Sequence, residues 1–192
     1  MTSDEQLILE LQQGSDAAFT ELFLRYRERV YGFFRRRMND AAQAEELAQE
    51  TFLAVLRAAQ RYEPRATFRA YLFGIAFNIL TAHRRKSALN TTQSDSAPEE
   101  VPYPSGTNPE NVIWVRQAVE RLDDAEREVL LLREFEELSY EEIAKMLHAP
   151  VNTVRSRLFR ARLALREILA TTPGNLGGRK GLHPLTLSSN KR

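Results

Sequence analysis

The sequence predicts an all-α fold of two small helical domains joined by a flexible linker, the second domain carrying a helix-turn-helix. Apolar residues recur at spacings of three and four along most of the chain, and no stretch alternates convincingly with a period of two. The segment at 87–109, SALNTTQSDSAPEEVPYPSGTNP, is acidic, rich in Ser, Thr, Pro and Asn, and without helical period. The expected organisation is therefore a domain at 1–86, this linker, a domain at 110–171 and a flexible basic tail at 172–192.

Four helices are expected in the first domain. They lie at 4–13, at 16–38, after the cap Asp40, and at 67–86. Gly14 ends the first helix. Pro64, in RYEPRAT, separates the third helix from the fourth because proline cannot continue a helix.

Four further helices are expected in the second domain, at 110–122, 124–136, 139–147 and 152–169. Ser139 followed by Glu142 is a capping box, which marks a helix start. Pro150 ends that helix, and Asn152 is expected to cap the next one. A short helix, a tight turn and a longer helix is the plan of a helix-turn-helix.

The last of these helices has one apolar side and one basic side when drawn at about 100° per residue. The apolar side is formed by Val154, Leu158, Ala161, Leu165 and Ile168. Phe159 lies opposite, among five arginines between Arg155 and Arg166 with no acidic residue. Arginines bind phosphates and guanines, and an apolar group suits the thymine methyl, so this face predicts DNA binding. The alternative is a solvated basic helix with a stray phenylalanine.

The charge distribution supports this interpretation although the formal net charge is only +1. Residues 109–151 carry 5 Lys or Arg and 11 Asp or Glu, whereas residues 152–192 carry 9 and 1. Residues 1–86 carry 13 and 11. An acidic block followed by a basic block suggests that one surface meets a polyanion and another meets a different partner.

The composition also excludes several classes. The chain has no cysteine, so disulfides and thiolate metal sites are ruled out. Its three histidines are far apart, which argues against a zinc site, and no cofactor is expected. No apolar run approaches membrane-spanning length, and the acidic N-terminus does not resemble a signal peptide. We therefore expect a soluble cytosolic protein without membrane insertion.

The motifs together resemble the extracytoplasmic-function (ECF) group of bacterial RNA polymerase sigma factors. LSYEEIAKMLHAPVNTVRSRLFRARLALRE resembles the promoter-reading region, and LDDAEREVLLLREFEEL resembles the helix before it. QAEELAQETFLAVLRA resembles the polymerase-binding helix, and RYEPRATFRAYLFGIAFNILTAHRR resembles the minus-10 recognition and melting segment. The likeness covers nearly all of residues 5–170 in the order of the family.

The resemblance implies a dissociable factor that binds core RNA polymerase, directs it to promoters and promotes strand opening. The residues that match the grip on the coiled coil of the largest subunit are Glu46, Leu47, Gln49 and Glu50. From the residues alone, a solvated acidic face is the default, and Leu47 has packing as its alternative. The polymerase flap region and promoter DNA are further implied partners.

DNA contacts are implied at two places. The minus-10 residues are Arg61, Tyr62, Thr67, Phe68 and Asn78, with Phe68 alternatively buried. The minus-35 residues are Asn152, Arg155, Ser156, Arg157, Phe159, Arg160 and Arg162. Among the latter, Arg157 and Arg162, with Arg166, are expected mostly on phosphates, and Arg155, Ser156, Phe159 and Arg160 on bases.

Three positions depart from the family pattern. His148 stands where the turn usually has Gly, and it must tolerate a positive φ. Asn152 stands where Gly is common, and Gln43 replaces a frequent Asp, so one acidic contact to polymerase is missing. Family members are commonly restrained by an anti-sigma factor, and they act in the bacterial cytoplasm, at the nucleoid when in holoenzyme.

Two other functions compete with this one. A polymerase-independent helix-turn-helix regulator would leave residues 15–86 without a task. A helical enzyme such as a nuclease has no carboxylate cluster, histidine pair or nucleophile to support it, so the protein is not expected to be an enzyme.

Overall fold

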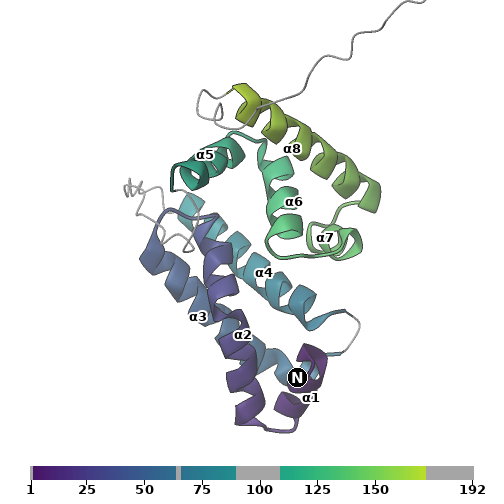
Figure 1. Cartoon of the computed structure of the whole chain (residues 1–192). Helices are drawn as coiled ribbons and strands as arrows, with labels where there is room; N and C mark the ends of the chain where they lie inside the picture. Colours follow the sequence, from purple (N-terminus) through teal and green to yellow (C-terminus); the bar gives the residue numbers. More distant parts are fainter. Residues whose placement is uncertain (1, 64–65, 90–108, 172–192) are drawn as a thin grey trace, which may run out of the picture.

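The structure is a computed structural model that describes residues 2–63, 66–89 and 109–171 (Figure 1). The described residues form eight α-helices and one 3₁₀ turn, and they contain no strand. The elements are α1 (Asp4–Gln12), α2 (Asp16–Arg35), α3 (Ala41–Ala58), the 3₁₀ turn η1 (Ala59–Arg61), α4 (Phe68–Leu89), α5 (Pro109–Glu120), α6 (Asp124–Glu134), α7 (Tyr140–Met146) and α8 (Val151–Thr171). The all-α prediction is confirmed.

Helices α1 to α4 pack together as a first unit (Figure 1). Side-chain oxygens of Ser3, Ser15 and Asp40 cap α1, α2 and α3, and Gly14 adopts the left-handed φ of +90° between α1 and α2. The centre of the unit is aromatic, because Phe33 meets Phe73 with ring centroids 5.7 Å apart. Both rings are fully buried.

Helices α5 to α8 form a second unit, in which α8 packs on α5, α6 and α7. The predicted capping box is confirmed: the N–H of Glu142 donates to Ser139 Oγ at 3.1 Å, and the N–H of Ser139 donates to Glu142 Oε2 at 2.8 Å. The turn between α7 and α8 bends at His148, whose φ of +49° is the left-handed value expected there. The second unit therefore contains the helix-turn-helix.

The two boundaries of the expected linker differ from expectation, and α2 ends at Arg35 instead of residue 38. Helix α4 continues to Leu89, three residues into the expected linker, because Ser87, Ala88 and Leu89 tolerate helical backbone while remaining exposed. Helix α5 begins at Pro109, a favourable first residue of a helix. The remainder of the expected linker and the tail at 172–192 lie outside the described residues.

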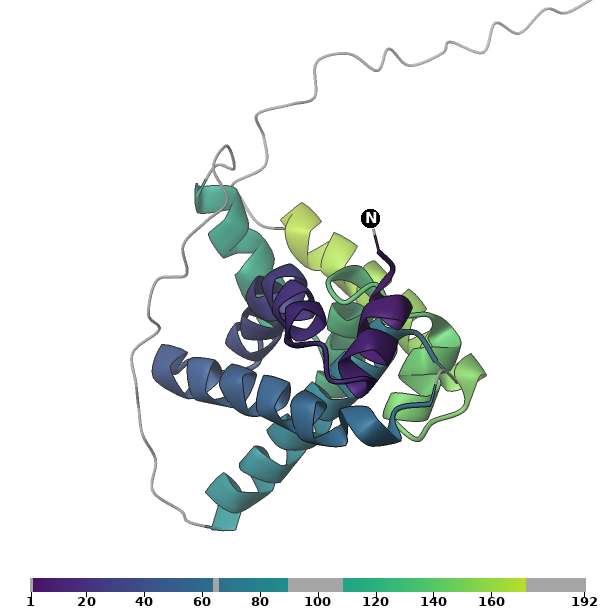
Figure 2. The same cartoon turned by 90° about the horizontal axis from the view of Figure 1, so that it is seen from below.

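The two units lie directly against each other, which the sequence did not predict. The side of α4 contacts α7, and the C-terminal end of α2 faces the turn between α6 and α7 (Figures 1 and 2). No helix in the described part of the chain has the length and hydropathy needed to cross a membrane.

Candidate nucleic-acid interface

Helix α8 presents a polar and basic face away from the core. Val154, Leu158 and Ala161 are buried, as the sequence predicted. Phe159 is 69% exposed, one residue along from Leu158. A large aromatic side chain left in water between arginines has no packing role, so it is available to a ligand.

The arginines of this face remain accessible to a ligand, because the ion pairs that two of them form are weak. Arg155 and Ser156 are exposed, and Arg157 is partly buried. Arg160 donates to Glu126 and Arg162 to Glu134, both at 2.6 Å. The hydrogen bond to Glu134 raises the pKa of Arg162. Exposed ion pairs of this kind contribute little stability, so a phosphate can replace the carboxylate.

Asn152 does not cap α8. The helix begins at Val151, and the Pro150 carbonyl accepts from the N–H groups of Thr153 and Val154. Proline before the first turn presets a helical φ, so the helix starts one residue earlier than the sequence suggested. Asn152 is exposed in the first turn of the recognition helix.

The 61–78 segment keeps three of its five predicted DNA residues at the surface, namely Arg61, Thr67 and Asn78. Tyr62 is only 5% exposed, and its hydroxyl donates to the Ala66 carbonyl at 3.2 Å. Its ring packs edge-on against Tyr71, with centroids 4.9 Å apart. Burial, with Glu5 and Tyr71 nearby, raises the pKa of Tyr62. Tyr62, implied as a minus-10 contact, is therefore not exposed to a DNA base in this conformation.

Phe68 is also buried, at 1% exposed, and its ring packs edge-on against Tyr26. The packing alternative for Phe68 is confirmed, and its ring is not exposed to a DNA base in this conformation. Thr67, directly before it, caps α4 by accepting from the N–H of Ala70 at 3.2 Å. Its hydroxyl also donates to Glu142 of the second unit at 2.6 Å. Pro64 and Arg65, directly before this stretch, lie outside the described residues.

Helix α3 presents an exposed acidic face. Glu46, Gln49 and Glu50 are exposed on it, as predicted. Leu47 is 6% exposed and packs in the core, so its alternative role is confirmed and it is not available as a contact. Leu53, which the sequence reasoning missed, is 49% exposed and lies four residues after Gln49. Continuing the spacing of three and four from Glu46 and Glu50 would have found it.

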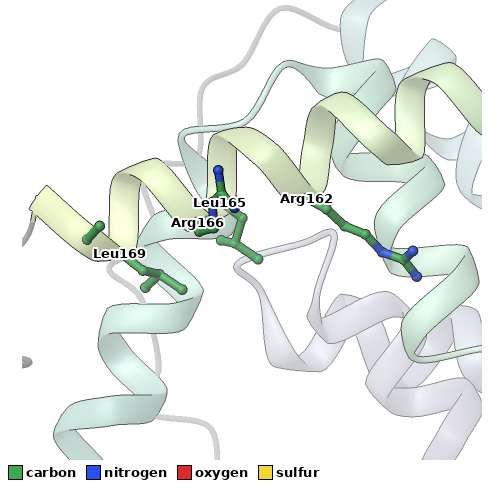
Figure 3. Close-up of a pocket in the computed structure, with 5 residues that line it drawn as sticks. Arg162, Leu165, Arg166 and Leu169 are labelled. Carbon is green, nitrogen blue, oxygen red and sulfur yellow. The ribbon is translucent and has the colours of Figure 1, made fainter. Parts of the chain in front are cut away.

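A shallow, mostly apolar cleft lies along the C-terminal half of α8 (Figure 3). Leu165 and Leu169 project from the same side of the helix, and Arg162, Arg166 and Ala170 complete the lining. Leu165 belongs to the apolar side predicted from the sequence, and it is only partly covered by the core. The cleft is therefore an apolar surface bordered by two cations.

These features define a helix-turn-helix DNA-binding protein built from two helical units. Family models agree: Sigma-70 region 2 matches residues 22–89, and Sigma-70 region 4 matches residues 113–165. RNA polymerase sigma-H factor of Pseudomonas aeruginosa is 34% identical over 86% of this chain and 93% of its own. ECF RNA polymerase sigma-E factor of Salmonella typhimurium is 32% identical over 85% and 92%.

A solved structure supports the same family. CnrH, in complex with the cytosolic domain of CnrY, superposes with a TM-score of 0.67 at 25% identity, covering 88% of this chain and 98% of that one. The chain belongs to the ECF group of RNA polymerase sigma factors. It is a transcription-initiation factor, and the membership favours this function over a polymerase-independent regulator.

Proposed function

We propose that the two units divide the work of promoter recognition. The first unit, with the core-binding face of α3 and the 61–78 segment, binds polymerase and the minus-10 strand. The second unit reads the minus-35 element with α8. The observation that carries this proposal is the exposed Phe159 on a helix face lined with arginines.

On α8, Arg155, Ser156, Phe159 and Arg160 are proposed to read bases. An arginine suits guanine, and the Phe159 ring suits the methyl group of thymine. Arg157 and Arg162 are proposed to bind phosphates, with Arg166 beyond them. Asn152, exposed in the first turn, is placed where its amide or the helix N-terminus can meet the DNA backbone.

On α3, we propose that Glu46, Gln49 and Glu50 bind the coiled coil of the largest polymerase subunit. Leu53 replaces Leu47 in this role, because it adds apolar area beside the acidic side chains. The cleft along α8 is proposed to receive the polymerase flap, with Leu165 and Leu169 providing the apolar contact.

In the 61–78 segment, strand opening is proposed to depend on Arg61, Thr67 and Asn78. The chain contains no nucleotide-binding motif, so melting is driven by binding energy. Asn78 can donate to and accept from a base edge, and Arg61 can hold the backbone. Tyr62 and Phe68 act indirectly, by fixing the loop from within the core.

We further propose that an anti-sigma factor restrains this protein, since the similar CnrH is solved with the cytosolic domain of CnrY. The site of action is the cytoplasm, at the nucleoid when the factor is part of holoenzyme. The role requires no catalytic group in this chain, because nucleotide addition belongs to the polymerase.

Run-off transcription on genomic fragments, with core polymerase added to the purified protein, tests the function. Defined start sites that depend on both components are the expected result. Specific DNA binding without any co-purification of core polymerase would instead support the polymerase-independent regulator. Magnesium-dependent cleavage of the fragments by the protein alone would support an enzyme.

A further inference from the structure

Helix α1 has no part in the proposed function, although it packs on α2, η1 and α4 (Figure 1). The match to Sigma-70 region 2 begins at residue 22, so α1 lies before it. The helix is docked by its apolar side, because Leu7, Ile8 and Leu11 are all buried. The attachment of α1 therefore rests mainly on apolar contacts, and its polar contacts with backbone groups of the first unit have a different effect.

Gln12, the last residue of α1, holds the chain where η1 ends. Its side-chain Nε2 donates to the Ala59 carbonyl at 2.9 Å and to the Tyr62 carbonyl at 2.8 Å. Gln60 donates in return to the Gln12 carbonyl at 2.8 Å. Carbonyl groups at the end of a helix lack donors within that helix, and the Gln12 amide supplies them from outside. The backbone beside Arg61 is fixed in this way.

Glu5, about two turns earlier on α1, holds the chain where α4 begins. Its Oε1 accepts from the N–H of Phe68, the first residue of α4, at 3.2 Å. A carboxylate at this position also meets the positive end of the helix dipole. Glu5, Ile8 and Gln12 are spaced by three and four residues, so they share one face of α1 over a length of about 10 Å. One face of α1 therefore reaches from the end of η1 to the start of α4.

Two of the proposed minus-10 residues stand directly beside these held backbone groups. Arg61 precedes Tyr62, and Thr67 precedes Phe68. Both side chains are exposed, as is Asn78 further along α4. A strand binds more tightly to residues that are already in place, because less chain entropy is lost on binding. Helix α1 is thus placed to preset Arg61 and Thr67 relative to Asn78.

We propose that α1 is a splint for the minus-10 surface, in which Gln12 and Glu5 are positioning residues that fix the backbone beside Arg61 and Thr67. This role rests on the proposed function, because it assumes that Arg61, Thr67 and Asn78 bind the separated strand. Gln12 and Glu5 act through the backbone groups that they hold and not through contact with DNA. Loosening either end weakens strand binding and base discrimination, and it leaves minus-35 recognition by α8 unchanged.

The test uses the full chain, alone and assembled with core polymerase. Gln12→Leu removes the amide at one end and Glu5→Leu removes the carboxylate at the other, so each variant tests the splint independently. Glu5→Gln keeps an acceptor for the Phe68 N–H and is the conservative variant. Gln13→Leu, at the exposed position next to Gln12, is the matched control.

Four measurements separate positioning from general stability. Hydrogen–deuterium exchange of the backbone amides at 59–63 and 66–71 reports how firmly α1 holds the two ends. Fluorescence anisotropy gives the affinity of holoenzyme for a labelled single strand that carries the nontemplate minus-10 element of a promoter identified by run-off transcription. The same strand with one base exchanged gives base discrimination. A duplex that carries only the minus-35 element gives the affinity of α8, and thermal unfolding gives stability.

We expect faster exchange in Gln12→Leu and in Glu5→Leu. The affinity for the single strand should fall by about threefold to tenfold in each, the range expected for the loss of one hydrogen bond. Base discrimination should fall with it, whereas affinities for the minus-35 duplex and for core polymerase should stay at the parent's values. Glu5→Gln should lose less than Glu5→Leu, and Gln13→Leu should match the parent.

Parent-like exchange in the folded variants would refute the splint. Faster exchange with unchanged strand affinity and base discrimination would refute the positioning role. An equal fall in affinity for the minus-35 duplex would also refute it, because that result indicates a general loss of structure. If the parent neither binds core polymerase nor opens promoters, the proposed function fails, whereas the exchange result still decides whether α1 holds the two ends.

Discussion

At the scale of single residues, neighbouring positions on α8 have opposite tasks. Leu158 is 2% exposed and Phe159 is 69% exposed. The buried Leu158 contributes to the free energy of unfolding. The exposed Phe159 contributes little to it, and its ring is accessible to a ligand. Substituting each in turn separates stability from recognition.

Phe159→Ala should relax the base preference at one promoter position while leaving thermal stability nearly unchanged, because its ring is largely in water. Leu158→Ala should instead reduce the free energy of unfolding by about 2–5 kcal/mol through the cavity it leaves. Promoter selection from a randomised minus-35 element, together with thermal unfolding, measures both. Unaltered base preference in the Phe159 variant contradicts its assignment.

The ion pairs of Glu137 with Arg29 and Arg69 predict how acid affects the packing of the two units against each other. Arg29, followed by Arg69, lowers the pKa of Glu137 below its ordinary value of 4.5. Ionised Glu137 therefore stabilises the packed arrangement of the two units at pH values above its ordinary pKa. This contribution is lost as the pH falls through the lowered pKa. At Glu142, burial acts to raise the pKa, but hydrogen bonds from Thr67 and Ser139 together outweigh it, so this pKa is lowered as well.

Because the chain has no cysteine, Thr20→Cys on α2 and Glu167→Cys on α8, both exposed, can carry a fluorescence energy-transfer pair. Energy transfer between the two units should be constant above pH 4.5 and fall below it. Glu137→Gln should show less of this acid dependence. Circular dichroism over the same pH range separates opening from unfolding. An identical pH profile in the variant would show that other groups control the acid response.

At the scale of the helix, α3 exposes one face and buries the other. Leu47 packs in the core, whereas Leu53 lies beside Glu46, Gln49 and Glu50 in the surface. The position of each leucine around the helix, and not its apolar character, decides which one a partner can reach.

Leu53→Ala should weaken binding to core polymerase without lowering the unfolding temperature. Reversing charge at Glu46 and Glu50 should do the same, because both side chains are exposed. Leu47→Ala is the matched control, and it should destabilise the fold by about 2–5 kcal/mol. Titration of labelled protein with core polymerase measures the affinity, and unchanged affinity in the folded surface variants contradicts the proposed face.

At the scale of the whole molecule, the proposed promoter opening depends on contacts between the first unit and the separated strand. Opening base pairs costs a few kcal/mol, which contacts to the separated strand must offset. Arg61, Thr67 and Asn78 are the exposed candidates that remain once Tyr62 and Phe68 are placed in the core.

Arg61→Ala with Asn78→Ala should reduce permanganate reactivity of unpaired thymines near the start site on duplex promoters. A pre-melted bubble should partly restore transcription, because it supplies the strand separation that these residues help to stabilise. Full reactivity in the double variant would show that melting depends on other residues.

The sequence alone determined the local features of this protein. Helical periodicity, the capping box of Ser139 and Glu142, the two faces of α8 and the left-handed turn at His148 are set by residues a few positions apart. Such short-range patterns are readable because backbone geometry fixes which neighbours meet. The resemblance of these local motifs to a known family then implied the function.

Only the tertiary structure decided the features that depend on distant neighbours. Tyr62 is buried against Tyr71, and Phe68 against Tyr26, so neither is free to stack on a base. Arg37 and Glu136 lie 99 residues apart in the chain, and no periodicity predicts that they share one buried pair. Burial and charge pairing of this kind arise from how whole helices pack, which the pattern within any one helix does not encode.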